Sequence, residues 1–296
     1  MSRIKQFALS LLERKELIKR KFIDPEKYIK TLFYQRTGYP LNLDNPRTYN
    51  EKLQWLKMYW HNPILTTLVD KYAVKDFVKE RIGEQYVIPT IGVWDKVSDI
   101  DWNKLPIQFV LKSTHDSGGL VICKDKSQLD RRSALKKSMA NNYYYFGYEW
   151  PYKNVVPRII AEPYLEDPET RELRDYKFFC FNGVVRALFI ATDRNKEGVD
   201  VKFDFFDEEF NHLPFKQGHE NASILPAKPH CFEEMKVLAT TLSRGFPHVR
   251  VDFYEVDGHV YFGEMTFFHH GGWTKFDPER WDEVFGSWLT LPEKQI

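Results

Sequence analysis

The feature that most constrains this chain is a pair of apolar segments near its end that carry charged residues. The segments are 249–254 and 261–266, with Asp257-Gly258 between them, and their alternation of apolar and polar residues predicts a β-hairpin. Its polar members are Arg250, Asp252, Glu264 and Thr266. Two carboxylates on neighbouring strands repel each other unless a cation lies between them, and such oxygens suit Mg²⁺ together with water and phosphate. The pattern therefore indicates either a metal site or a salt bridge on a solvated strand face.

The length of the turn decides which of these side chains share a face. A two-residue turn at Asp257-Gly258 places Asp252 opposite Gly263 and separates the carboxylates. Pairing Asp252 with Glu264, and Arg250 with Thr266, requires a β-bulge or a three-residue loop that includes His259. We predict the three-residue loop. In that register the apolar face consists of Val249, Val251, Phe253, Tyr261 and Met265.

Length and composition limit the class of protein. The chain has 296 residues, enough for a large core and two subdomains. Its 43 Lys and Arg balance 42 Asp and Glu, so net charge gives no support to nucleic-acid binding. Cys123, Cys180 and Cys231 are widely spaced, which argues against a disulfide framework or a zinc cluster. Isolated cysteines fit a reducing compartment, so we expect a cytoplasmic protein. We also expect that it binds no nucleic acid.

Residues 1 to about 35 are basic and are expected to be helical. No apolar run is as long as a transmembrane helix, and Glu13-Arg14-Lys15 interrupts the first apolar stretch, which makes a poor signal peptide. A basic amphipathic helix here could rest on the inner face of an anionic membrane. We favour the alternative, a helix that docks on the body of the protein.

Local signals predict further helices and strands. Thr48 and Glu51 have the spacing of a capping box that begins a helix, and a second helix is expected over 63–81 with its end at Gly83. Asn182-Gly183 lies between apolar alternations and predicts a second hairpin. The other expected elements are strands at 108–112, 120–122 and 159–162 and helices at 129–141 and 233–244.

Lys112 ends an apolar strand and is followed at once by the small, polar, glycine-rich loop 113–119. Backbone N–H groups in such a loop can hold phosphate oxygens, and a lysine before the loop supplies positive charge. The loop has neither the Walker A nor the Rossmann glycine pattern. By itself, this arrangement is more typical of an ordinary turn.

Two further positions are candidates for binding or catalysis. Glu162 ends an apolar strand and precedes Pro163-Tyr164-Leu165, an arrangement that suits the edge of an adenine base. Asp175 and Lys177 lie two residues apart and therefore share a strand face, where a plain cross-strand salt bridge is the alternative.

In this order along the chain, the motifs resemble the ATP-grasp superfamily. They most resemble its TupA-like branch, which is associated with teichuronopeptide and other cell-surface polysaccharide biosynthesis. The resemblance covers about residues 65 to 275 and is carried by 70–75, 109–112, 160–165, 175–178, 249–254 and 262–267. It implies an α+β ATP-grasp fold in which two α+β subdomains, 65–155 and 156–296, clasp ATP after an N-terminal helical region, 1–64.

The resemblance also implies roles for single residues. Asp252 and Glu264 would bind one or two Mg²⁺ ions, or Mn²⁺, and Thr266 stands where many relatives have an asparagine ligand. Arg250, Lys177 and Arg194 would be catalytic and would act on the phosphate or the carboxylate. The residues expected to bind ATP are Lys71, Lys112, His115, Asp116, Ser117, Gly118, Gly119, Glu162, Pro163, Tyr164, Leu165 and Asp175.

An aromatic cluster at 143–152 lies between the expected subdomains. Aromatic rings with a polar group suit sugars, so Tyr144, Tyr148 and Trp150 are candidates for a glycan acceptor site, and packing in the core is the favoured alternative. His269 and His270 follow the segment 261–266, which carries Glu264, and would close the cleft. Adjacent strand residues point in opposite directions, so joint zinc binding is not expected.

The implied parts suit a ligase that phosphorylates a carboxylate with ATP and joins the acyl group to an amine. The expected partners are a uronic-acid carboxylate of a polysaccharide, or another sugar-acid acceptor, and an amino acid or other small amine. One alternative is a glycosyltransferase of capsular polysaccharide biosynthesis, for which Asp99-Ile100-Asp101 is the only Asp-x-Asp. A second is a non-catalytic glycan-binding protein with an ATP-grasp fold.

Overall fold

The structure is a computed structural model that describes residues 23–116, 119–128, 132–168, 171–194 and 198–295. Its α-helices are α2 (Pro25–Thr37), α3 (Tyr49–Tyr59), α4 (Ile64–Val69), α5 (Val74–Ile82), α6 (Arg132–Met139), α7 (Tyr144–Gly147), α8 (Phe232–Ser243) and α9 (Arg280–Trp288). The 3₁₀ helices are η1 (Glu84–Tyr86), η2 (Val97–Asp99), η3 (Lys126–Gln128), η4 (Trp150–Asn154) and η5 (His269–Gly272). Within the described ranges, no helix has both the length and the apolar character that crossing a membrane would require.

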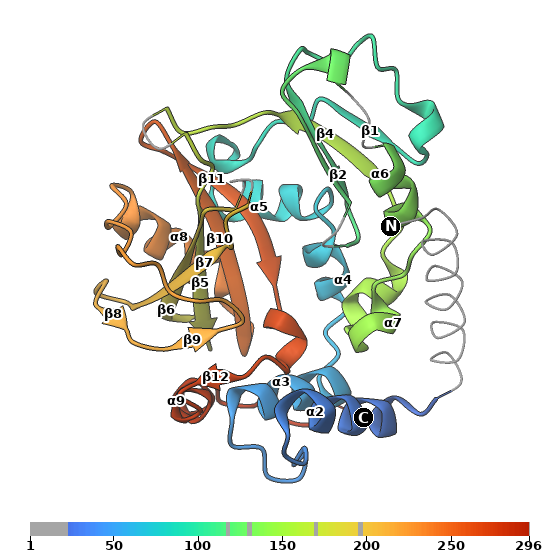
Figure 1. The fold of residues 1–296 in the computed structure, drawn as a ribbon. Helices are drawn as coiled ribbons and strands as arrows, with labels where there is room; N and C mark the ends of the chain where they lie inside the picture. Colours follow the sequence, from blue (N-terminus) through green and yellow to red (C-terminus); the bar gives the residue numbers. More distant parts are fainter. Residues whose placement is uncertain (1–22, 117–118, 129–131, 169–170, 195–197, 296) are drawn as a thin grey trace.

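The strands form three sheets. They are β1 (Gly92–Trp94), β2 (Phe109–Ser113), β3 (Leu120–Cys123), β4 (Ile159–Pro163), β5 (Asp175–Phe181), β6 (Val184–Thr192), β7 (Lys202–Asp207), β8 (His212–Leu213), β9 (Lys216–Gln217), β10 (His248–Val256), β11 (His259–Thr266) and β12 (Phe276–Asp277). The strand orders are β1-β4-β2-β3, β11-β10-β5-β6-β7-β8 and β12-β9. Figure 1 shows the four-stranded sheet and α6 in one lobe, the six-stranded sheet in a second, and α2, α3 and α9 beneath them.

The four-stranded sheet moves the boundary between the subdomains. β4 pairs antiparallel with both β1 and β2, with Leu111 opposite Ala161. The expected boundary at 155/156 is therefore wrong, because the chain returns to complete the first sheet before it enters the second. The first subdomain ends after Pro163, and its own small core includes Phe109, Leu111 and Ile159.

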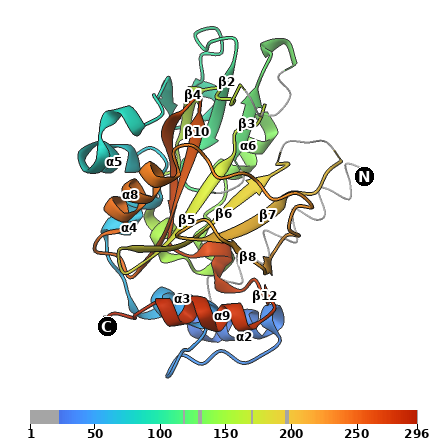
Figure 2. The same cartoon turned by 90° about the vertical axis from the view of Figure 1, so that its left-hand side faces the viewer.

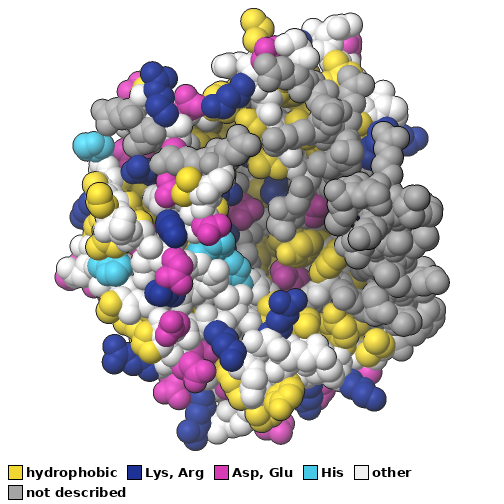
Figure 3. Space-filling view, in the orientation of Figure 1, with side chains coloured by type: hydrophobic (Ala, Val, Ile, Leu, Met, Phe, Trp, Pro, Cys, Tyr) yellow, Lys and Arg dark blue, Asp and Glu magenta, His cyan; other side chains and the backbone are white. Residues whose placement is uncertain are grey.

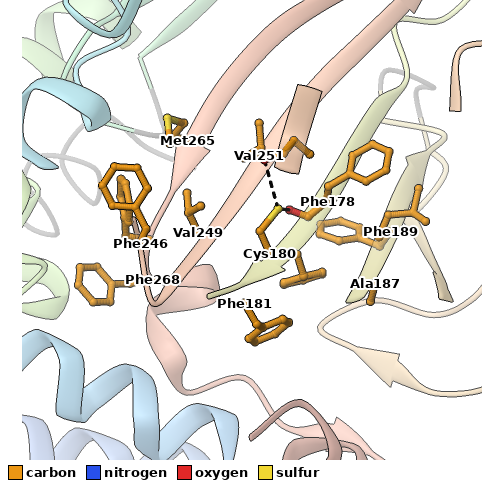
Figure 4. Close-up of a cluster of buried hydrophobic side chains, with 14 of the residues drawn as sticks. Phe178, Cys180, Phe181, Ala187, Phe189, Phe246, Val249, Val251, Met265 and Phe268 are labelled. Atoms are coloured by element: carbon orange, nitrogen blue, oxygen red, sulfur yellow. Dashed lines mark hydrogen bonds between the residues drawn. The ribbon is translucent and has the colours of Figure 1, made fainter. Parts of the chain in front are cut away.

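The six-stranded sheet contains the main core. α8 covers one face, where Phe178 of β5 packs against Phe232 of α8 with ring centroids 6.0 Å apart. Figure 4 shows Cys180, Val249, Val251 and Met265 in the same region. α3 and α9 cover the lower end of the opposite face, as Figure 2 shows. The upper end of that opposite face carries the charged side chains described below.

The β10–β11 hairpin has the predicted pairing but not the predicted turn. Arg250 lies opposite Thr266 and Asp252 opposite Glu264, yet beyond a β-bulge Phe253 pairs with Phe262 and Val256 with His259. The turn is thus the two-residue Asp257-Gly258, with φ of 52° and 70°. The positive φ of both turn residues matches the right-handed twist of the strands, which favours the two-residue turn. Gly263 is the unpaired residue of β11 and lies in the bulge. As a consequence Phe262, and not Tyr261, joins the apolar face opposite Phe253.

We expect Gly263→Ala to destabilise the hairpin. An added Cβ would lie 3.1 Å from the backbone oxygen of Asp252 and 3.2 Å from the ring of Tyr254. Crowding of this kind should lower the free energy of unfolding by about 1–3 kcal/mol, measured by urea denaturation. Gly258→Ala is a poor control because φ there is positive, whereas Ala227→Gly changes an exposed loop and should have little effect. A Gly263→Ala protein as stable as wild type would contradict the need for glycine in the bulge.

The helices before the first lobe match local signals except at one place. Thr48 and Glu51 form the predicted capping box, but the helix expected over 63–81 is two helices, α4 and α5. The break occurs because the Asp70 carboxylate accepts hydrogen bonds from the N–H groups of Tyr72 and Ala73, at 2.8 and 3.2 Å, which competes with helical bonding. Arg158 pairs with the same carboxylate at 2.7 Å. Most of the predicted basic N-terminal helix, residues 1–22, lies outside the described ranges.

His248 of β10 is a buried histidine with both ring nitrogens engaged. Its Nδ1 lies 3.0 Å from the Cys180 carbonyl, which can only accept, so Nδ1 donates and Nε2 accepts from the Tyr49 hydroxyl at 2.9 Å. Burial lowers the pKa of His248 to about 3, because no water remains to solvate the imidazolium. The fold therefore holds this histidine neutral.

We expect acid to destabilise the fold through this residue. The unfolded chain binds a proton near pH 6.5 and the folded chain does not until about pH 3, so stability is fully present above pH 6.5 and is lost as pH falls toward 3. Between pH 7 and pH 5 the loss from His248 alone should be about 2 kcal/mol, measured by urea denaturation. His248→Gln can make both hydrogen bonds without titrating and should lose that part of the pH dependence. An unchanged pH dependence in His248→Gln would exclude His248 as its source.

Candidate active site

Two adjoining cavities lie between the two large sheets. The smaller, about 230 Å³, is lined by charged side chains from both lobes, and the larger, about 570 Å³, extends along β2, β3 and the chain after β4. Both are lined by Lys112, Glu162, Arg194 and Tyr254, so they form one cleft. Figure 3 shows Lys, Arg, Asp and Glu side chains close together in the hollow between the lobes. The cleft thus has a charged end and a more apolar end.

Three lysines of the first lobe face the cleft. Lys75 of α5 and Lys112 of β2 each pair with one carboxylate oxygen of Glu162, at 2.5 and 2.7 Å. Burial would raise the pKa of Glu162, but the two lysines hold it below its usual value, so the carboxylate is ionised. Lys71 donates to the Asp116 carbonyl at 2.5 Å. Glu162 therefore positions two cations, a role the sequence did not suggest.

The segment after Glu162 lines the larger cavity. Pro163, Tyr164 and Leu165 all border it, together with Val110 and Ile122 of the neighbouring strands. Open backbone groups beside apolar side chains are what a flat aromatic base requires. The prediction that this segment binds adenine therefore remains consistent with the geometry, and it stays a prediction.

The glycine-rich loop enters the site only in part. Asp116 and Gly119 line the smaller cavity, and the Asp116 carboxylate accepts from the N–H of Gly119 at 3.0 Å. His115 does not line either cavity. It is buried, and its Nε2 lies 3.1 Å from the Ser138 carbonyl, so its side chain faces away from the cleft that the prediction gave it. Ser117 and Gly118 lie outside the described residues.

The charged end of the cleft is a network on β5, β10 and β11. Arg250 donates from Nε and Nη2 to the two oxygens of Asp252, each at 2.7 Å. Nη2 also lies 3.0 Å from Glu264 Oε1 and 3.0 Å from Thr266 Oγ1. Lys177 pairs with Asp252 and, at 3.2 Å, with Asp175, which in turn pairs with Arg194. The structure thus brings together all of the predicted catalytic and metal-binding residues.

Neighbouring charges keep the groups of this network ionised. Burial by itself would raise the pKa of Glu264, but Lys177, Lys71 and Arg250 lower it far below its usual range. Burial would likewise lower the pKa of Arg250, and Asp252 and Glu264 raise it instead. The Glu264 side chain remains 36% exposed toward the cleft, whereas Asp252 is fully buried. Glu264 is therefore the carboxylate that solvent and ligands reach first.

The oxygens of this network suit a magnesium ion. Among the described residues, no group of three or more His, Cys, Asp or Glu side chains is placed to hold a metal, but Mg²⁺ needs only one or two carboxylates. Oxygens of Asp252, Glu264 and Thr266 all lie within 3.0 Å of one atom, Arg250 Nη2. Arg250 Nη2 thus occupies a point that three oxygens surround, which is the environment that a metal cation requires. Thr266 Oγ1 lies 3.3 Å from Glu264 Oε1, so it is close enough to share that position.

The aromatic cluster is mostly core. Tyr148 is 4% exposed and packs against Tyr144 and Tyr28, so its ring has no free face and its prediction as a sugar contact is wrong. Trp150 is half-buried and packs against His61, with ring centroids 4.8 Å apart. Tyr144 is half-buried against the same core. This segment therefore joins the lobes, and no cavity described above includes it.

The two histidines after β11 differ. His269 is fully buried behind Arg250, with its Nδ1 2.7 Å from Arg250 Nη1, so it does not close the cleft as predicted. His270 has φ of 48° and packs its ring near Phe203, with centroids 6.1 Å apart. The backbone turns here because His270 and Gly271 are left-handed, and the two imidazole rings stay in contact, with centroids 4.2 Å apart.

Sequence reasoning missed Lys75, Tyr254 and Gln217. Lys75 lies within the 70–75 motif that carries the resemblance, which was an available signal. Tyr254 lies two residues after Asp252 on the same strand face, and it lines both cavities. No sequence signal distinguishes Gln217, which reaches His269 across the fold.

A comparison with protein families gives a match over most of the chain. The chain belongs to the TupA-like ATP-grasp family, whose model matches residues 51–290. This confirms the expected family and the α+β ATP-grasp fold. A comparison with curated protein sequences gave no match.

The solved structures that this chain matches include two ligases and a synthetase. D-alanine–D-alanine ligase from Bacillus anthracis, complexed with ATP, is 16% identical with a TM-score of 0.42 over 69% of this chain and 57% of that one. D-alanine–D-alanine ligase from Helicobacter pylori is 12% identical with a TM-score of 0.43 over 81% and 69%. The ADP complex of N5-carboxyaminoimidazole ribonucleotide synthetase is 11% identical with a TM-score of 0.43 over 73% and 50%. This chain thus spans little more than half the length of the Bacillus anthracis enzyme.

Proposed function

We propose that the protein is an ATP-dependent carboxylate–amine ligase that works through an acylphosphate. The observation that carries the proposal is the convergence of Arg250, Lys177, Asp252, Glu264 and Thr266 at one end of a cleft whose other end is more apolar. An apolar end suits a base and a charged end suits phosphates. Membership of the ATP-grasp family supports ATP as the nucleotide.

The residues of the charged end suit both steps of such a reaction. A carboxylate oxygen of the substrate attacks the γ-phosphorus and ADP leaves; an amine then attacks the acyl carbon and phosphate leaves. Bound Mg²⁺ would neutralise phosphate oxygens and orient the γ-phosphoryl group. Lys71 and Lys177 supply positive charge on either side of the smaller cavity, and Arg250 supplies donors for the charge that develops on the acylphosphate.

The substrates proposed are a uronic-acid carboxylate of a cell-surface polysaccharide, or another sugar-acid acceptor, and an amino acid or other small amine. This part of the proposal rests on resemblance to the TupA-like branch. Its setting would be the cytoplasm, at or near the inner face of the membrane. Since Tyr148 is buried, the proposal does not use the aromatic cluster as a sugar platform.

The test is nucleotide binding followed by turnover. Calorimetry should detect Mg²⁺-dependent binding of ATP and ADP, and a uronate with an amine should release ADP and phosphate. Glu264→Gln should weaken the Mg²⁺ dependence, and Glu293→Gln, an exposed carboxylate that does not line the cleft, should not. Binding of nucleotide sugars without ATP would favour a glycosyltransferase, and binding of glycans without either would favour the non-catalytic alternative.

A further inference from the structure

A chain of three hydrogen bonds lies behind Arg250. Arg250 Nη1 lies 2.7 Å from Nδ1 of His269, and Nε2 of His269 lies 3.1 Å from Oε1 of Gln217. The amide nitrogen of Gln217 donates to the Thr274 carbonyl at 3.3 Å. Gln217 is held in β9 by its pairing with Phe276. These hydrogen bonds therefore link the guanidinium to the backbone of Thr274, beyond the site.

The partners of His269 fix its protonation from both sides. The Gln217 amide nitrogen is used by Thr274, so its oxygen faces His269, and because an oxygen of this kind only accepts, Nε2 must carry a proton. A guanidinium only donates, so Nδ1 must be bare. Both contacts require the same neutral tautomer, with the proton on Nε2.

The surroundings of His269 enclose it and keep it neutral. Its side chain is fully buried, edge-on to Phe179 at 4.9 Å between ring centroids and against Phe189 at 5.5 Å. Burial, with the nearby His270 and Arg250, lowers its pKa well below the usual value. A second cation 2.7 Å from the guanidinium would be repelled, so the neutral form is the one that can hold Arg250.

The other described hydrogen-bond partners of Arg250 are the oxygens of Asp252, Glu264 and Thr266. These are the oxygens proposed to bind Mg²⁺, so a bound cation would compete with the guanidinium for them. The bond to His269 is the one that a cation would leave intact. We propose that His269, oriented by Gln217, is the positioning residue that keeps the Arg250 guanidinium aimed at the reacting groups when its carboxylate partners turn to the metal. This inference rests on the proposed function.

The first test is the tautomer itself. Nuclear magnetic resonance of nitrogen-labelled histidine, with the His269 signal assigned by its loss in His269→Gln, should show a single neutral Nε2–H form with and without ADP and Mg²⁺. Gln217→Met removes the acceptor and should allow the Nδ1–H form to appear. A protonated ring, the Nδ1–H tautomer or a mixture in the wild-type protein would overturn the inference.

The second test is kinetic. His269→Phe keeps a ring of similar shape without a lone pair and should lower kcat about 10–100-fold, with the KM for ATP nearly unchanged. His269→Gln can accept from Arg250 and donate to Gln217, so it should recover most of the loss, while His230→Phe, an exposed histidine outside the cleft, should have no effect. Equal losses for Phe and Gln at position 269, or a rise in KM in place of a fall in kcat, would overturn the proposal.

A double-mutant cycle guards against general damage. If His269 acts through Arg250, His269→Phe should cost little further once Arg250→Ala has been made, whereas independent damage would multiply the two losses. Should His269→Phe fail to fold, the same cycle can be made with Gln217→Met. The tautomer measurement needs no turnover. A protein that forms no amide would therefore refute the proposed function alone, and a wrong tautomer in an active ligase would refute this inference alone.

Discussion

Arg250→Ala should lower turnover by about 10²–10³-fold, because the variant loses donors that face the charge developing on the acylphosphate and on the tetrahedral intermediate. The guanidinium is buried and bonds Asp252, Glu264, Thr266 and His269 in the protein without ligands, and the His269 bond would still orient it once a metal has taken the carboxylates. The rate of ADP release with a uronate and an amine measures the effect.

Two controls separate catalysis from folding. Arg250→Lys keeps the charge but not the planar fork and should recover only part of the loss, since a lysine cannot bond Asp252 and His269 at once in the same plane. Arg186→Ala removes an exposed arginine that pairs weakly with Glu208, at 3.9 Å, and should leave turnover unchanged. ADP binding by each variant reports whether the cleft is intact. Near-normal turnover of a folded Arg250→Ala protein would remove Arg250 from the mechanism.

The parts of this site that sequence reasoning could reach are those set by local rules. Alternation along a strand places Arg250 and Asp252 on one face, and the need to bring Asp252 near Glu264 selects the register that the structure has. Asn182 and Gly183 have the positive φ that their hairpin requires. Each of these features depends on a few neighbouring residues, and therefore on information that the sequence displays directly.

The parts that sequence reasoning missed depend on contacts between distant segments. A bulge at Gly263 and a three-residue turn that includes His259 give the same pairing of Asp252 with Glu264. The sequence therefore could not show which of the two residues is left unpaired. Glu162 binds Lys75 and Lys112 only because β4 returns beside β2, which also explains the misplaced subdomain boundary. His269 differs from His270 because the backbone turns at that point. Only the packed fold holds that information.

Asp252→Asn should destabilise the protein by about 3–5 kcal/mol, since it removes the charge that balances two buried cations. The Asp252 carboxylate is fully buried and accepts from Arg250 at both oxygens as well as from Lys177. The amide of asparagine keeps the shape of the carboxylate, yet its NH₂ group would face the N–H donors of Arg250 or Lys177. Because the amide is neutral, Glu264 would be the one remaining carboxylate bonded to Arg250. Urea denaturation without nucleotide measures this loss, and calorimetry should show that Mg²⁺ no longer strengthens ADP binding.

Asp204→Asn is the matched control. Asp204 is also fully buried, but its carboxylate accepts from the N–H of Ala222, at 3.1 Å, and is within salt-bridge distance of no described cation. Burial raises the pKa of Asp204, so its ionised form destabilises the fold. Replacement should therefore lower the free energy of unfolding by about 1 kcal/mol or less. Similar losses at positions 204 and 252 would mean that the network around Asp252 is held by shape and hydrogen bonds. A much larger loss at 252, together with lost Mg²⁺ dependence, would mean that one carboxylate both balances the buried cations and serves the metal.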